Sequence, residues 1–199
     1  MFITVEGIDG SGKTTLVEGL SRRLGPGVVV TMEPWDPAIK AALRPLMDKV
    51  GGRDEALAEF FLFSADRALH SRLIREALSE GKVVISDRYL DSSVAYQGPR
   101  LGMDFEEALG WMMEVSRFFP TPDITLLLDL DPRVALGRIS DRDTKIGYEK
   151  VEFLVRVRDW YLRLADRFPE RIKVLDASLP PERVLEDALR ELGGAGIGP

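Results

Sequence analysis

Five short apolar runs alternate along the chain with segments of helical periodicity. The runs cover residues 2–6, 28–31, 83–86, 124–129 and 172–175. Apolar residues recur at helical spacing over residues 12–24, 36–47, 54–80, 105–119, 132–140, 149–168 and 181–192. Continuous apolar strands that alternate with helices are typical of a parallel sheet buried on both faces. We therefore predict a three-layer α/β fold, with helices on both faces of a five-stranded parallel sheet.

Composition indicates a single domain over residues 1–199. The chain is 45% hydrophobic, which is enough for one well-packed core, and no interior stretch reads as a linker or a repeat. The apolar runs are too short to cross a bilayer, and residues 1–6 enter a strand with no charged-then-apolar leader. We expect a cytoplasmic enzyme without a signal peptide or membrane contact. The absence of cysteine excludes disulfides and cysteine–zinc sites.

A phosphate-binding motif follows the first predicted strand. Residues 7–14 read Gly-Ile-Asp-Gly-Ser-Gly-Lys-Thr and match the P-loop pattern. Gly7 and Gly12 permit the tight turns and close backbone approach that a phosphate needs at the start of a helix. Lys13 can reach the β- and γ-phosphates of a nucleotide, and the Thr14 hydroxyl can ligate Mg²⁺. A glycine-rich turn without a ligand is the alternative, but the flanking strand and helix favour a phosphotransferase of the P-loop NTPase fold.

Charge and composition narrow the class of P-loop protein. The net charge of −6 argues against a nucleic-acid or anionic-membrane partner, so an acidic chain that binds phosphates must gather its 20 arginines and 7 lysines locally. A GTPase reads guanine with Asn-Lys-x-Asp, and this chain has no asparagine. Motor and AAA-type ATPases are usually larger. A small kinase remains, which must bind a second substrate beside ATP.

Two segments are candidates for binding that second substrate, because ligands bind at the carboxyl ends of strands in such sheets. Asp87 can hold the Mg²⁺ shell and Arg88 can clamp a phosphate, although a helix-capping aspartate beside a surface arginine is the alternative. Phe63 and Arg67 share one helix face, so they can stack on a pyrimidine and donate to its carbonyl. Position alone leaves Phe63 equally open to a place in the core. We expect a surface or capping role, rather than a catalytic one, for His70.

The chain resembles the thymidylate kinases, and more closely their bacterial branch, over nearly its whole length. The most specific matching parts are residues 7–15, residues 63–67, Asp87-Arg88-Tyr89 with Ser92, residues 95–98 and residues 174–178. This resemblance implies transfer of phosphate from ATP to dTMP, with Mg²⁺, in a homodimer. The ATP site that it implies consists of Gly7, Ile8, Asp9, Gly10, Ser11, Gly12, Lys13, Thr14, Thr15 and Arg138.

The same resemblance implies a role for each residue at the acceptor site. Phe63 stacks on thymine, and Arg67 addresses a carbonyl of the base. Tyr96 crowds the position of a ribose 2′-hydroxyl and so selects deoxynucleotides. The other implied acceptor residues are Asp9 near the sugar and phosphate, Arg88 and Arg44 at the phosphate, and Ser92, Gln97, Glu33 and Pro34 around the pocket.

Residues 138–149 are expected to form a lid over ATP. In the bacterial branch that the chain resembles, the lid supplies an arginine that the P-loop lacks, and this P-loop has Gly10 where the other branch has an arginine. The resemblance therefore implies that Arg142 is catalytic and that Arg138 stacks on adenine. The alternative is a charged, solvated helix end.

Three departures from the family pattern affect these expectations. The usual Thr-Arg-Glu-Pro-Gly-Gly reads Thr-Met-Glu-Pro-Trp-Asp at residues 31–36, which lacks the arginine and both glycines. Ser140 replaces a lid arginine, and Ile-Gly-Tyr-Glu at residues 146–149 replaces the usual Asp-Arg-x-Glu. The lid is therefore poorer in arginine than the family pattern.

An acceptor phosphate needs no general base, because its second pKa of about 6 leaves it largely dianionic at neutral pH. The expected catalytic groups are Mg²⁺ with Asp9, Lys13, Arg88 and Arg142. Two alternatives stay open. One is a nucleoside monophosphate kinase with another base preference, and the other is a P-loop regulator that binds nucleotide without turnover.

Overall fold

The strands form one parallel sheet in the order β2-β3-β1-β4-β5. The computed structural model describes residues 1–47, 50–139 and 151–194. The strands are β1 (Phe2–Gly7), β2 (Val28–Met32), β3 (Val83–Asp87), β4 (Ile124–Asp129) and β5 (Ile172–Asp176). Each predicted strand is confirmed to within one residue at its end. The five-stranded parallel α/β fold predicted from the apolar runs is therefore confirmed.

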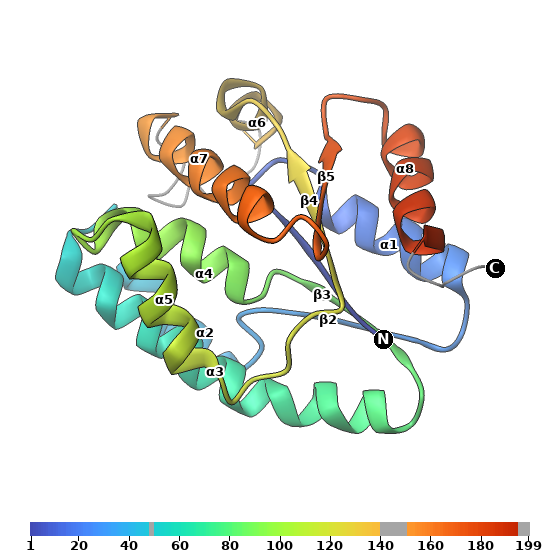
Figure 1. Cartoon of the computed structure of the whole chain (residues 1–199), viewed down its shortest axis with the longest axis horizontal. Helices are drawn as coiled ribbons and strands as arrows, with labels where there is room; N and C mark the ends of the chain where they lie inside the picture. The colour runs from blue at the N-terminus through green and yellow to red at the C-terminus, as the bar shows by residue number, and fades with distance from the viewer. Residues whose placement is uncertain (48–49, 140–150, 195–199) are drawn as a thin grey trace.

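Helices cover both faces of the sheet (Figure 1). They are α1 (Lys13–Leu24), α2 (Pro37–Met47), α3 (Arg53–Ser79), α4 (Leu90–Gln97), the 3₁₀ turn η1 (Gly98–Arg100), α5 (Phe105–Ser116), α6 (Pro132–Ile139), α7 (Val151–Arg167) and α8 (Pro181–Gly194). Helices α1 and α8 pack together on one face, and α3, α4, α5 and α7 lie on the other. Helix α2 packs against α3, and α6 packs against α7.

Local sequence signals account for most of these helices, with one exception. Asp36 caps α2 as expected, because its Oδ1 accepts the backbone N–H groups of Ala38 and Ile39 at 2.9 and 3.1 Å. Helix α4 was not predicted. Its buried side chains include Asp91, Ser93 and Gln97, so the segment lacks the apolar periodicity that marks a buried helix face.

The sheet brings the ends of β1 and β3 together at the edge where a ligand can bind. Strand β1 is buried along its whole length and lies between β3 and β4. Val5 of β1 pairs with Asp87 of β3, so the turn that follows Gly7 begins beside the end of β3. Across the described residues, no helix combines the length and apolar character needed to span a membrane.

Candidate active site

The P-loop forms a turn that opens directly into α1. Gly12 adopts the left-handed conformation that glycine favours (φ 98°) and is the residue that precedes the first turn of the helix. Gly10 also has a positive φ of 84°, and a Cβ at this position would lie 2.4 Å from the carbonyl oxygen of Ala135 in α6. The loop is therefore a helix N-terminus whose backbone closely approaches a second helix, and helix N-termini bind anions.

Lys13 belongs to the P-loop motif and is the first residue of α1, and its ammonium group folds back against the loop. Its Nζ donates to the carbonyl oxygen of Ile8 at 3.0 Å and lies 3.9 Å from Oδ1 of Asp9. Burial, followed by the nearby charge of Arg88, lowers the pKa of Lys13 to about 8. Lys13 and Arg88 are therefore two neighbouring cations in a partly buried site, and such a site favours the binding of a polyanion.

Arg88 faces the P-loop from the end of β3. Its Nη2 hydrogen-bonds to the carboxylate of Asp9, and its side chain is 19% exposed, so it is not the surface arginine of the alternative interpretation. Burial opposes ionisation of Asp9, but the charges of Arg88 and Lys13 hold the pKa of Asp9 below its usual value. The backbone of Arg88 is in the left-handed region (φ 71°), which is uncommon for a residue other than glycine.

Thr14 and Asp87 meet where α1 begins and β3 ends. The hydroxyl of Thr14 donates to Oδ2 of Asp87 at 3.3 Å. Hydroxyl and carboxylate oxygens are ligands that Mg²⁺ prefers, and Mg²⁺ usually takes only one or two protein ligands and completes its shell with water and phosphate. This pair fits such an ion, although the described residues contain no cluster of three or more His, Asp or Glu that could hold a metal by itself.

One cavity of about 680 Å³ runs over the P-loop. The predicted site residues that line it are Asp9, Gly10, Ser11, Gly12, Lys13, Thr14, Thr15, Glu33, Asp87, Arg88 and Arg138. At one end, Arg138 is anchored because its Nη2 donates to the carbonyl oxygen of Ala177 at 3.1 Å. Apolar side chains line the same cavity, among them Met32, which replaces the arginine of the family pattern, and Leu128, Ile139, Leu179 and Val184, to which the sequence assigned no role.

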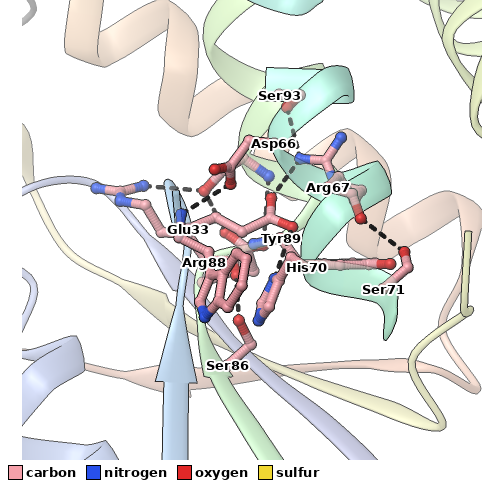
Figure 2. Close-up of polar contacts among 12 residues, drawn as sticks. Glu33, Asp66, Arg67, His70, Ser71, Ser86, Arg88, Tyr89 and Ser93 are labelled. Atoms are coloured by element: carbon pink, nitrogen blue, oxygen red, sulfur yellow. Dashed lines mark hydrogen bonds and ion pairs between the residues drawn. The ribbon is translucent and has the colours of Figure 1, made fainter. Parts of the chain in front are cut away.

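A second polar cluster lies beside this cavity, where α3 meets the end of β2 (Figure 2). The side chain of Arg67 is fully buried, and its Nη2 donates to Oε2 of Glu33 at 2.6 Å and to Oγ of Ser93 at 3.0 Å. The guanidinium lies 5.0 Å from the centre of the Tyr89 ring. Within the described chain, Nε and Nη1 of Arg67 are buried without a hydrogen-bond partner. These two nitrogens are buried from solvent, and Arg67 is not among the residues that line the cavity.

The prediction of a surface or capping role for His70 is wrong. His70 is fully buried, with Nε2 2.8 Å from Oγ1 of Thr31 and Nδ1 3.3 Å from Oε1 of Glu33. Its ring is stacked on Trp35, with centroids 5.8 Å apart and planes 12° apart. Helix α3 carries both His70 and Arg67 inward, and Glu33 lies between them (Figure 2).

The loop that contains Trp35 is held by a carboxylate of α3. Oδ2 of Asp66 accepts the backbone N–H of Trp35 at 2.8 Å, and Oδ1 accepts that of Asp36 at 2.7 Å. Burial raises the pKa of Asp66, and these hydrogen bonds oppose the shift. Trp35 and Asp36 therefore occupy the positions of the two glycines in the family pattern, and Asp66 of α3 holds their backbone N–H groups.

The remaining predicted acceptor residues are spread around these two clusters. Tyr96 is buried with its hydroxyl 3.4 Å from Nη2 of Arg88, and Gln97 donates from Nε2 to Oε2 of Glu59 at 2.9 Å. Phe63 is half-buried and lies outside the buried core clusters. The other predicted residues are the exposed Arg44 on α2, the half-buried Pro34, and Gly7 and Ile8 at the buried end of the first strand. Arg142, Ser140 and residues 146–149 lie outside the described residues, so the lid stays a prediction.

Sequence reasoning assigned no role to two of the buried groups behind Arg88, the carboxylate of Glu6 and the hydroxyl of Tyr161. Glu6 is fully buried at the end of β1 and accepts hydrogen bonds from Ser92 and from the hydroxyl of Tyr161. Burial, followed by the charge of Asp91, raises the pKa of Glu6 to about 7. An acidic residue in an otherwise apolar strand was a visible signal for Glu6. Tyr161 carried none, because it reads as one more residue of an apolar helix face.

The fold and the P-loop cavity define the class of protein as a P-loop phosphotransferase. The family model for thymidylate kinase matches residues 5–188. The chain belongs to the thymidylate kinase family.

Similarity to individual proteins extends over nearly the whole chain. A probable thymidylate kinase from Methanococcoides burtonii is 42% identical over 96% of this chain and 94% of its own length. A thymidylate kinase from Nitratidesulfovibrio vulgaris is 41% identical over 95% of this chain and 90% of its own length. The crystal structure of thymidylate kinase from Ehrlichia chaffeensis superposes with a TM-score of 0.72 at 32% identity, over 96% of this chain and 98% of that one. The bacterial-type branch stays a prediction.

Proposed function

We propose that this protein transfers the γ-phosphoryl group of ATP to dTMP and releases ADP and dTDP. Membership of the thymidylate kinase family, together with similarity over almost the full length, supports this activity. The structural observation that carries the proposal is a single cavity in which Lys13 of the P-loop and Arg88 of the neighbouring strand end both take part. Two cations in one cavity can bind the γ-phosphate of ATP and the phosphate of dTMP next to each other.

The donor is assigned to the P-loop side of the cavity. The triphosphate would bind across residues 7–15, with Lys13 at the β- and γ-phosphates, and the adenine would lie toward Arg138 and its apolar neighbours. Thr14 and Asp87 would hold Mg²⁺, which supplies charge neutralisation to the donor phosphates when it is bound.

The acceptor is assigned to the side of Arg88 and Arg67. Arg88, which lines the cavity, would hold the phosphate of dTMP. From the sequence, we propose that Arg67 donates to a carbonyl of thymine beside the ring of Phe63, and neither of these two residues is among those that line the cavity. Tyr96, next to Arg88, would lie against the deoxyribose and crowd a 2′-hydroxyl. The other acceptor residues proposed from the sequence are Asp9, Glu33, Pro34, Arg44, Ser92 and Gln97.

The chemical step needs alignment and charge neutralisation rather than proton transfer. An oxygen of the dianionic acceptor phosphate forms a bond to the γ-phosphorus, and the bond from that phosphorus to the β–γ bridging oxygen breaks, which releases ADP. Lys13 and Arg88 would offset the repulsion between the two anions as they approach. From the sequence, we propose that Arg142 of the 138–149 segment adds a further positive charge.

A second copy of the chain is the proposed partner. Helix α3 exposes Phe61 and Leu69 by 53% and 50%, two helical turns apart on one face, with Ala65 exposed between them. A homodimer through this stripe would bury it. Phe61→Glu or Leu69→Glu should convert a dimer into a monomer in sedimentation, whereas Val155→Glu, at an equally exposed site on α7, should not. The cytoplasmic location expected from the sequence remains a prediction.

An acceptor panel tests the proposed activity. ADP release should be measured with ATP, Mg²⁺ and each of dTMP, dUMP, UMP, CMP, AMP and GMP. A clear preference for dTMP is the expected result. Equal use of another monophosphate would favour a kinase of different base preference, and ATP binding without turnover on any acceptor would favour a regulatory P-loop protein.

A further inference from the structure

Behind Arg88, side chains from three separate elements form a buried hydrogen-bond network. Glu6 comes from β1, Ser92 from the first turn of α4, and Tyr161 from α7. Oγ of Ser92 is 2.5 Å from Oε2 of Glu6 and 2.8 Å from the hydroxyl of Tyr161. The Tyr161 hydroxyl donates to the same carboxylate oxygen at 3.0 Å. Nη1 of Arg88 donates to Ser92 at 3.0 Å and lies 3.5 Å from the Tyr161 hydroxyl.

The chemistry of these groups fixes the direction of the hydrogen bonds that Arg88 makes. A guanidinium can only donate, so the two hydroxyl oxygens must accept from Arg88. Their own hydrogens then point away from Arg88, toward Oε2 of Glu6, and either hydroxyl can instead donate to the other across their 2.8 Å contact. In either arrangement one carboxylate oxygen orients the pair of hydroxyl groups, and the lone pairs of those hydroxyls hold Nη1 of Arg88.

The other oxygen of the same carboxylate fixes the backbone beside Arg88. Oε1 of Glu6 accepts the backbone N–H of Tyr89 at 2.8 Å and that of Ser92 at 3.3 Å. These groups belong to the N-terminus of α4, which has no side-chain cap of its own at Tyr89. Glu6 thus caps α4 from β1. The hydroxyl of Ser86 donates to the carbonyl oxygen of Arg88 at 2.7 Å, in the same peptide group as the Tyr89 N–H, and at the other end of the residue the backbone N–H of Arg88 donates to the carbonyl oxygen of Val5 at 3.0 Å. The uncommon left-handed backbone at Arg88 is held from both ends.

We propose that Tyr161 and Glu6 are positioning residues for the acceptor phosphate, which act by holding one guanidinium nitrogen of Arg88 so that the other faces the cavity. Arg88 lines the cavity, whereas Tyr161 and Glu6 are not among its lining residues, so both act through Arg88. Nη2 of Arg88 remains directed to Asp9 at the P-loop. The inference rests on the proposed acceptor role of Arg88.

The test compares Tyr161→Phe with Trp160→Phe. The first change removes only a hydroxyl, and the second alters the neighbouring buried aromatic residue of α7, which packs on Phe105 outside the network. Tyr161→Phe should raise KM for dTMP about tenfold, the effect of losing a hydrogen bond to charged groups, while kcat and KM for ATP change less than about threefold. Trp160→Phe should leave all three within about twofold. Urea unfolding of both variants separates this acceptor-specific effect from a general loss of stability.

A second variant keeps the test decisive if Tyr161→Phe fails to fold. Glu6→Gln retains the size of the side chain but places amide hydrogens or a neutral oxygen against the two hydroxyls, so it should raise KM for dTMP by a similar factor. If KM for dTMP in both folded variants matches that of Trp160→Phe, the inference is wrong while the proposed function stands. An unmodified protein that turns over no monophosphate would overturn the proposed function and this inference together.

Discussion

The hydroxyl of Thr14 donates a hydrogen bond to Asp87, so the first turn of α1 touches the end of β3. Because the two oxygens meet where the donor phosphates are proposed to lie, Asp87→Asn should weaken metal use more than nucleotide binding. We expect the Mg²⁺ concentration for half-maximal turnover to rise about tenfold, equivalent to about 1.4 kcal/mol. Titration of turnover with Mg²⁺ at saturating ATP and dTMP measures this shift.

Asp104→Asn is the matched control for that substitution. Asp104 caps α5 by accepting the backbone N–H of Glu107 at 2.9 Å, and asparagine caps a helix equally well. Its Mg²⁺ dependence should therefore equal that of the unmodified protein. An unchanged Mg²⁺ dependence in Asp87→Asn would remove Asp87 from the proposed metal shell.

Trp35 stands where the family pattern has a glycine, and its stacking on His70 predicts a measurable loss when the glycine is restored. Trp35→Gly should lower the free energy of unfolding by about 1–2 kcal/mol, because an aromatic contact is lost and the unfolded chain gains freedom. Urea unfolding checks the value. Trp35→Phe, which keeps a ring in place, should lose less. Turnover should persist in both variants, and its abolition in Trp35→Gly with unchanged stability would instead place the indole in the reaction.

Arg100 and Glu59 form a buried ion pair that should dominate the stability of the η1 region. Both terminal nitrogens of Arg100 donate to the carboxylate at 2.8 Å, and the two side chains are only 3% and 0% exposed. Arg100→Met leaves a buried carboxylate without its main counter-charge and should cost about 3–5 kcal/mol in urea unfolding. Arg117→Met, in an exposed pair with Glu114, should leave stability nearly unchanged. Equal effects from the two substitutions would contradict this assignment.

The buried Glu6 predicts how stability depends on pH. Its pKa is about 7 in the folded protein against an ordinary value of 4.5, so the folded state binds an additional proton between these values. Stability is therefore lost as pH rises from about 5 to about 7, and it levels off above. Relative to Glu6→Gln, the unmodified protein should lose about 3 kcal/mol across this window. The charged and titratable groups around Glu6 are Asp91, Arg88, Tyr161, Lys13 and Arg171.

Urea unfolding at pH 5, 6, 7 and 8 measures that difference. The unmodified protein and Glu6→Gln share all other carboxylates, so the difference between their free energies of unfolding reports the titration of Glu6 alone. A difference in stability that stays constant over the series would show that Glu6 keeps its ordinary pKa in the folded state.

The fold could be predicted because its signals are local. Each strand contains a short run of mostly apolar residues, and the helices carry their own periodicity and caps, as Asp36 does for α2. Helix α4 escaped prediction because its buried face is polar and is satisfied by distant partners: Asp91 pairs with Arg171, and Gln97 donates to Glu59. Such a helix gives no apolar pattern to read.

Only those site residues that belong to a sequence motif or follow a predicted strand could be predicted. The P-loop and the Asp87-Arg88 pair were found in this way, and both line the cavity. The hydrogen bond between Glu6 and Tyr161 joins residues 155 positions apart, and it depends on how α7 packs over α4. His70 was misjudged for the same reason, since a histidine on an amphipathic helix does not reveal which partner covers it.

The contact between Gly10 and Ala135 constrains how this protein can diverge. Any side chain at position 10 would overlap the backbone of α6, the helix that carries Arg138, so the two segments share one boundary. A lineage could not acquire a P-loop arginine here by a single substitution, because α6 would have to move first. A positive charge carried on a side chain at position 10 would therefore require linked changes in the P-loop and in α6.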